Sequence, residues 1–121
     1  MSEFGFNVNS TATKGYLGEF VAVCLLKIKG YKILARRYKT VCGEIDIIAK
    51  RGDIIVFVEV KSRKSADKCY NAITDKQLQR IRRTSEIFMR HNKKSANCFS
   101  RYDVILIADW KLPIHIENIS I

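Results

Sequence analysis

The chain has little of what marks a membrane-spanning, secreted or multidomain protein. Its longest uninterrupted apolar run, Phe20–Leu26, has seven residues, whereas a membrane-spanning helix needs about 20. One proline and six glycines among 121 residues leave no low-complexity linker between two domains. The first residues lack the basic start and the long apolar stretch of a signal peptide. We therefore expect a single domain over residues 1–121, cytoplasmic, with a flexible N-terminus over residues 1–12.

Cysteines are few and widely spaced. They are separated by 18, 27 and 29 residues, so they form no C-x-x-C pair, and neither histidine lies at zinc-ligand spacing from one of them. Nothing in the sequence indicates a secreted protein in which disulfides would persist. We expect reduced, mostly buried thiols and no structural zinc site. The four are Cys24, Cys42, Cys69 and Cys98.

Acidic residues are scarce compared with basic ones. Twelve Asp and Glu stand against 22 Lys and Arg, which gives a formal net charge of +10. Between Lys61 and Arg101 twelve basic residues accompany only three acidic ones, a local net charge of +9. A basic half predicts a polyanionic partner, most commonly nucleic acid. The alternatives are a solubilising surface and, less favoured, an anionic membrane, for which no helix here pairs a basic face with a broad apolar one.

Hydrophobic periodicity predicts a first helix from about Lys14 to Lys29. Thr13 is its expected N-cap, and Gly30 supplies the left-handed residue that ends it. Glu19 lies off the expected apolar side, among residues that are themselves apolar. That apolar side carries Leu17, Val21, Cys24, Leu25 and Ile28.

Three strands are expected next, over about Tyr31–Lys39, Glu44–Ala49 and Ile54–Lys61. The last two form a hairpin through residues 50–53, where glycine and charged residues predict a turn. The run Ile54–Val58 is apolar at every position, so we expect a central strand that is buried on both faces.

The capping box Thr74–Gln77, with Ile73 and Leu78 as a hydrophobic staple, predicts the start of a second helix. It is expected to end near Asn92, followed by strands over 99–108 and 114–121. The inner side of this helix carries Leu78, Ile81, Ser85 and Phe88. The order helix, three strands, helix, two strands predicts an α/β fold with a mixed central sheet flanked by helices.

Asp46, Glu59 and Lys61 are the residues most suggestive of chemistry. Glu59 and Lys61 are two apart on one strand and therefore share a face. An even-length loop through Arg51 and Gly52 would put Asp46 opposite Phe57, diagonal to Glu59, whereas an odd loop would put it on the other face. Diagonal neighbours are about 7–8 Å apart, a gap that one hard cation and its ligand oxygens can span.

These residue types suit metal-assisted phosphodiester hydrolysis. Mg²⁺ is usually held by one or two carboxylates together with substrate phosphate. The metal makes a coordinated water more acidic, and a nearby lysine can orient that water or stabilise developing negative charge. The structural alternative is a salt bridge between acids and a lysine at the end of the sheet.

The motifs also resemble a known family. Gly43-Glu44-Ile45-Asp46, with Glu59-Val60-Lys61 thirteen residues after Asp46, resembles the PD-(D/E)xK nuclease signature, with Ile45 at the proline position. Together with Gly15–Glu19 and Arg101-Tyr102-Asp103-Val104, the pattern resembles the YraN family of small bacterial proteins. The spacing is also similar to that of archaeal Holliday junction resolvases.

This resemblance implies a restriction-endonuclease-like αβββαβ core and Mg²⁺-dependent cleavage of DNA, including branched or flapped structures, with Mn²⁺ as a substitute cofactor. It implies metal ligation by Asp46 and Glu59 and a catalytic role for Lys61. Glu19 matches a first-helix acid that binds the metal or its water. A carboxylate among apolar neighbours does need a partner, which Lys61 or exposure at the edge of the sheet would also satisfy.

We expect DNA rather than RNA as the partner, no membrane, and a homodimer, because resolvase relatives cut two strands symmetrically. Gln77 is expected to act mainly as a helix cap; the alternative, implied by the resemblance, is a contact with the site, as a glutamine in this helix makes in some members of the superfamily. Asp103 is expected to pair with Arg101, and the histidines to have no special role. Expected phosphate contacts are Arg63, Lys64, Lys76, Arg80 and Arg83. The alternative function is a non-catalytic nucleic-acid-binding module on the same fold.

Overall fold

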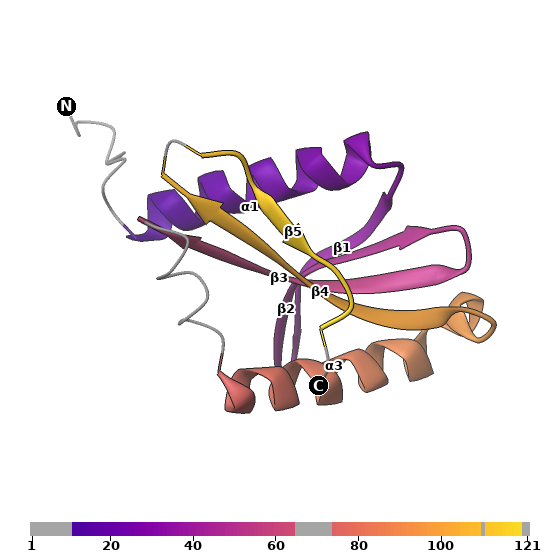
Figure 1. Ribbon diagram of the computed structural model, residues 1–121. Helices are drawn as coiled ribbons and strands as arrows, with labels where there is room; N and C mark the ends of the chain where they lie inside the picture. Colours follow the sequence, from indigo (N-terminus) through magenta and orange to yellow (C-terminus); the bar gives the residue numbers. More distant parts are fainter. Residues whose placement is uncertain (1–10, 65–73, 110, 120–121) are drawn as a thin grey trace.

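Two helices cover opposite faces of one sheet, as Figure 1 shows, in a computed structural model that describes residues 11–64, 74–109 and 111–119. The elements in order are α1 (Thr11–Ile28), β1 (Lys32–Thr40), β2 (Gly43–Arg51), β3 (Ile54–Arg63), α3 (Asp75–His91), the short 3₁₀ helix η1 (Lys93–Ser95), β4 (Phe99–Ala108) and β5 (Ile114–Ile116). The predicted α/β class and order of elements are confirmed. β5 is shorter than expected.

The sheet has five strands in the order β1-β2-β3-β4-β5. β3 pairs in parallel with β4, and the other neighbours are antiparallel. A parallel connection needs a crossover, and α3 lies within it. β3 is central, and its residues Ile55–Val58 are at most 1% exposed, which confirms the expected burial on both faces.

Each helix builds its own apolar layer against the sheet. Below α1, Ala22 and Leu26 pack with Ile47, Val56 and Val58. Between α3 and the other face of the sheet, a second layer contains Ile45, Ile48, Phe57, Ile81 and Phe88. At the start of α3, Thr74 Oγ1 accepts from Gln77 N at 3.2 Å, which confirms the predicted N-cap. Ile73, the other half of the predicted staple, lies outside the described residues.

The buried side of α1 was predicted wrongly. Leu17 is 48% and Ile28 83% exposed, and the helix begins at Thr11 rather than after a cap at Thr13. Apolar residues surround most of this helix, so periodicity does not select one side. The sheet instead contacts the side with the smallest residues, since a Cβ on Gly18 would lie only 3.2 Å from Ser62 Cβ. The buried residues are Gly18, Glu19, Ala22, Val23 and Leu26.

The β2–β3 hairpin has the even loop that the site requires, but its register differs by two residues from the prediction. Arg51 pairs with Ile54 across the loop, and Ile48, not Asp46, lies opposite Phe57. Gly52 has φ +62°, and the first central position of a two-residue loop is where a positive φ is needed. The loop is therefore Gly52-Asp53, and this shift brings Asp46 level with Glu59.

Two other sequence expectations can be compared with the structure. Three of the four cysteines, Cys24, Cys42 and Cys98, are free but only half-buried, so they are less buried than expected; Cys69 lies outside the described residues. The N-terminal segment expected to be flexible, 1–12, overlaps the start of α1 at Thr11. Among the described helices, none is both long and apolar enough to cross a membrane.

Candidate metal and nucleic-acid site

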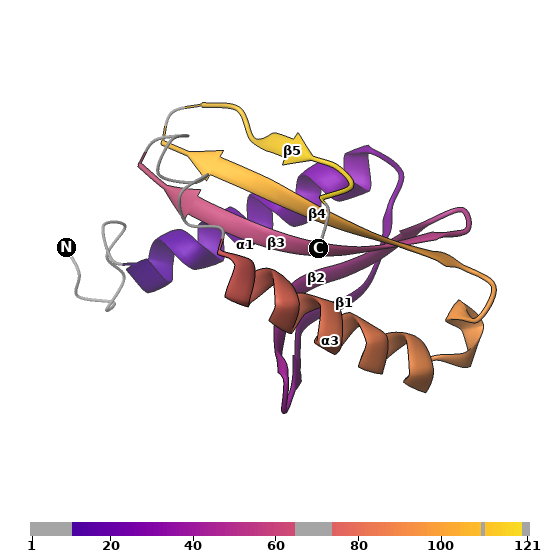
Figure 2. The same ribbon diagram turned by 60° about the horizontal axis from the view of Figure 1, so that its bottom comes forward.

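A distortion in β1 and β2 sets the position of Asp46. Residues two apart in a regular strand share a face, yet Ile45 packs on the α3 side and Ile47 on the α1 side. The paired strand is irregular at the same level, because Arg37, which falls beside Asp46 in the register, has φ +51°. Figure 2 shows the tip of the β1–β2 hairpin bending away from the rest of the sheet.

Asp46 and Glu59 form a carboxylate pair. Asp46 Oδ2 accepts a hydrogen bond from Val60 N at 2.8 Å, and the Asp46 side chain is also hydrogen-bonded to Glu59. Gln77 Nε2 donates to Glu59 Oε2 at 2.9 Å. The pair is thus held by a strand amide on one side and by the first turn of α3 on the other.

The electrostatics of the pair favour a bound positive charge. Burial raises the pKa of Glu59, and the hydrogen bond and negative charge of Asp46 raise it further, to about 9, although Lys61 and Gln77 oppose the shift. At neutral pH a proton therefore holds the two carboxyl groups together. A divalent cation can replace that proton, and two carboxylates are an oxygen donor set that Mg²⁺ uses. These residues fit the expected metal.

Basic residues follow the pair along β3 and occur at the start of α3. Lys61 is near enough for its charge to lower the pKa of Glu59. Arg63 and Lys64 follow it at the end of β3, and Lys76 neighbours Gln77; all three are exposed. The start of α3 adds the partial positive charge of a helix N-terminus. The structure thus brings together Asp46, Glu59 and Lys61. Arg80 and Arg83 continue along the exposed side of α3.

Glu19 does not join this pair as a third acid. It is 9% exposed, so the argument that it needs a partner holds, but its partners are arginines. Glu19 Oε1 lies 3.1 Å from Arg37 Nε and 3.7 Å from Arg36 Nη2. No group of three His, Cys, Asp or Glu suited to a metal occurs among the described residues. The irregular backbone of β1 turns two arginines toward Glu19, so these are its partners in the structure, and metal ligation by Glu19 stays a prediction.

Two further contacts, of Gln77 and Arg37, complete the surroundings of the site. Gln77 was expected mainly to cap its helix, with a contact to the site as the alternative. Its backbone N–H donates to Thr74 Oγ1, and its side chain reaches Glu59 across 18 residues of sequence. The available signal for this contact was the polar side chain of Gln77 at the last position of the capping box. Arg37 links Glu19 to the neighbourhood of Asp46, and nothing in its strand marked it.

Asp103 has a structural role, as expected. It accepts from Arg101 Nε at 2.9 Å and Nη2 at 2.8 Å, from His115 Nε2 at 2.8 Å, and from Asn118 N at 3.0 Å. Burial alone would raise the pKa of Asp103, but these hydrogen bonds lower it to about 2. Its lone pairs are thus fully used within the protein. His115 was wrongly expected to have no particular role.

Comparison with known proteins agrees with the motifs. Residues 18–107 match the model of Uncharacterised protein family UPF0102. A UPF0102 protein of Mesorhizobium japonicum is 41% identical over 105 residues, covering 87% of this chain and 84% of its own length. One from Sinorhizobium fredii is 43% identical over 106 residues, covering 87% and 86%. The chain belongs to UPF0102. This is the YraN family whose motifs the sequence resembles.

The UPF0102 match contains the whole candidate site. It begins at Gly18, where α1 approaches β3, and ends at Ile107 near the end of β4. Asp46, Glu59 and Lys61 all lie inside it. β5, with His115, falls outside, so the site is built from the segment that defines membership in UPF0102.

Proposed function

We propose that this UPF0102 protein is a Mg²⁺-dependent endonuclease that hydrolyses phosphodiester bonds of DNA, including branched or flapped structures. The observation that carries the proposal is the Asp46–Glu59 pair beside Lys61, at the basic end of β3. The similarity of its motifs to the PD-(D/E)xK superfamily supports it. Mn²⁺ is the expected substitute for Mg²⁺.

Each residue has a distinct task in the proposed reaction. Asp46 and Glu59 hold the cation, and the amide of Val60 and the side chain of Gln77 orient their oxygens. When bound, Mg²⁺ supplies positive charge at the phosphate and makes water more acidic. Lys61 places an ammonium group beside the scissile phosphate, where it can orient water or stabilise developing charge.

The basic half of the chain supplies substrate binding in this proposal. Arg63 and Lys64, at the end of β3, and Lys76, beside Gln77, contact phosphates, with Arg80 and Arg83 further along α3. We favour DNA over RNA because the motif resemblance is to DNA nucleases. A homodimer, which would present two sites to two strands, stays a prediction.

A cleavage assay tests the proposal. Linear, nicked, flap and four-way DNA are incubated with Mg²⁺ or Mn²⁺, and we expect cleavage of at least one of them. Lys61→Ala should reduce the rate by roughly 10²–10³-fold while DNA binding is retained. Lys111→Ala, at an exposed lysine in another part of the chain, is the matched control and should cleave normally. Tight binding without cleavage of any substrate would favour the alternative, a binding module.

The metal site has a separate test that does not depend on turnover. Asp46→Asn and Glu59→Gln should each remove the rise in melting temperature that Mn²⁺ causes, because each removes one anionic ligand of the pair. Glu19→Gln tests the third ligand that the motif resemblance implies: loss of the rise would add Glu19 to the metal site, and a retained rise would assign it to its arginine partners alone. An unchanged Mn²⁺ effect in both ligand variants would contradict the assignment.

A further inference from the structure

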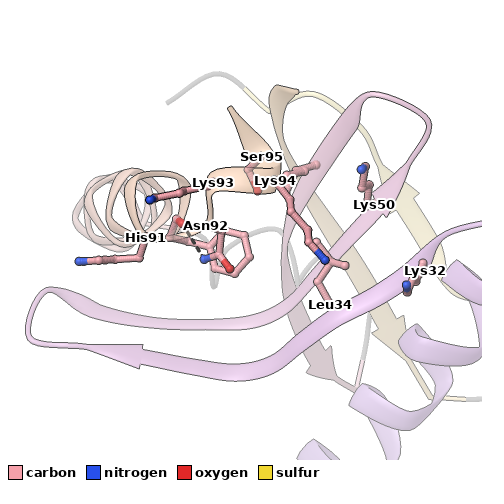
Figure 3. Close-up of a pocket in the computed structure, with 10 residues that line it drawn as sticks. Lys32, Leu34, Lys50, His91, Asn92, Lys93, Lys94 and Ser95 are labelled. Atoms are coloured by element: carbon pink, nitrogen blue, oxygen red, sulfur yellow. Dashed lines mark hydrogen bonds between the residues drawn. The ribbon is translucent and has the colours of Figure 1, made fainter. Parts of the chain in front are cut away.

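A second basic feature lies at the other end of α3. A hollow of about 620 Å³ opens between the end of α3, η1 and strands β1 and β2. Figure 3 shows Lys93 and Lys94 on its helical side and Lys32 and Lys50 on its strand side. Among the described residues that line it, none is acidic. We call this hollow the lysine pocket.

The charges of the lysine pocket are not neutralised within the fold. Lys32, Lys93 and Lys94 are exposed and Lys50 is half-buried, and none of the four has an ion-pair partner within the described parts of the chain. These lysines line one hollow and carry like charges, whose mutual repulsion a bound anion would offset. The chemistry of the pocket therefore calls for a ligand with several negative charges.

The floor of the pocket restricts the kind of anion. Two of its three apolar lining residues, Ile55 and Phe88, are 1% and 6% exposed, and only the third, Leu34, is accessible at 38%. A single leucine side chain is too little apolar surface for an acyl chain. A lipid headgroup would leave its chains without a place to insert. The lysine groups at the rim are the accessible ones, and a phosphate backbone passing through the hollow would meet them.

Helix α3 connects the pocket to the carboxylate pair. Gln77 contacts Glu59 near the start of the helix, and His91 lines the pocket at its end. At 1.5 Å per residue these two positions are about 21 Å apart. Exposed basic residues occur along the helix between them, at positions 80, 83 and 90. Both positions therefore lie along one basic element.

We propose that the lysine pocket binds the phosphate backbone of the nucleic-acid substrate at a second point, about six base pairs from the carboxylate pair at 3.4 Å per base pair. The distance to the cut rests on the proposed function, whereas binding itself does not. A substrate must then extend about six base pairs beyond the cleavage point to reach both positions.

The test is binding of two DNA hairpins, with stems of 4 and 14 base pairs, measured by fluorescence anisotropy in EDTA so that no cleavage occurs. Lys93→Ala/Lys94→Ala should weaken binding of the long stem by roughly 10–30-fold at 0.15 M salt, the expected effect of two lost phosphate contacts. The short stem can occupy only one of the two positions at a time, so its affinity should fall much less than that of the long stem. Lys27→Ala/Lys111→Ala removes two exposed lysines elsewhere and should bind both stems normally.

Other outcomes overturn the inference. Unchanged affinity for the long stem would remove the pocket from the DNA interface, and an equal loss on both stems would contradict the spacing. Sodium tripolyphosphate is titrated in parallel by thermal shift. If it stabilises the parent protein but not the Lys93→Ala/Lys94→Ala variant while long-stem affinity is unchanged, the pocket is a small-anion site instead. Since EDTA removes any metal, a failed cleavage assay leaves this result interpretable.

Discussion

Burial and Asp46 raise the pKa of Glu59, whereas Lys61 and Gln77 lower it. The net result is a carboxyl group that keeps its proton at neutral pH. A cation that binds the pair must displace this proton, so metal affinity should rise with pH, up to tenfold per pH unit below about pH 9. Isothermal titration with Mn²⁺ between pH 6 and 8 measures this dependence.

Single substitutions should move this pKa in opposite directions. Asp46→Asn removes the charge that raises it, so the pKa of Glu59 should fall. Gln77→Ala removes a donor that lowers it, so the pKa should rise above that of the parent protein. Carboxyl ¹³C NMR titration of Glu59 in metal-free buffer measures both shifts. Changes of the same sign in the two variants would contradict the arrangement of the pair.

The same pKa has a consequence for stability without metal. The folded protein binds a proton at Glu59 between its ordinary pKa of 4.5 and about 9, where the unfolded chain does not. Stability from this group is therefore complete below pH 4.5 and is lost as pH rises toward 9. A bound cation removes this loss, because it replaces the proton between the two carboxylates.

Among the elements, the β2–β3 hairpin most directly determines the site. Its two-residue loop sets the register that brings Asp46 level with Glu59. Gly52 has φ +62°, and a Cβ there would meet nothing within 4 Å. Gly52→Ala should therefore destabilise the protein by about 1–2 kcal/mol through backbone strain alone. Gly52→Asn, which tolerates this conformation better, is the control and should cost less. Urea unfolding measures both, and equal losses would contradict a purely conformational effect.

Local chemistry explains which elements the sequence predicts well. The start of α3 follows from a cap within four residues, Thr74 to Gln77, and the burial of β3 follows from its continuous apolar run. The sharp bend at Asp46 depends on Arg37 in a different strand. The buried side of α1 depends on how closely Gly18 approaches Ser62. Neither feature leaves a pattern within its own segment of the sequence. This is why the Asp46–Glu59 pair could be predicted, whereas the exact register of the β2–β3 hairpin could not.

The role of Glu19 illustrates the same limit at the site. The sequence argument that a carboxylate among apolar residues needs a partner was sound. The sequence left three explanations open: a metal or its water, Lys61, or exposure at the edge of the sheet. The structure supplies a different partner, Arg37, with Arg36 nearby. Choosing among these explanations requires knowing which way the side chains of β1 point. The hydrophobic periodicity of α1 carries no information about the irregular backbone of β1.

Across the whole molecule, the excess positive charge is concentrated in one segment of the chain. Of the net charge of +10, +9 belongs to the segment from Lys61 to Arg101, which contains α3 and ends in β4. The carboxylate pair lies at the start of that helix and the lysine pocket at its end. A polyanion that follows α3 would meet basic groups over the full length, and its affinity would depend strongly on counterion release.

The salt dependence of DNA binding tests this arrangement. For duplex DNA, log affinity should fall with log salt with a slope of about −0.9 per neutralised phosphate. Replacing Lys76, Arg80 and Arg83 together by alanine should make the slope shallower by roughly 2.7, three times that value, without altering sequence preference. Lys27→Ala/Lys39→Ala/Lys111→Ala removes the same charge from other exposed positions and should leave the slope close to that of the parent. If the α3 variant keeps the parental slope while the control loses it, the binding face lies off this helix.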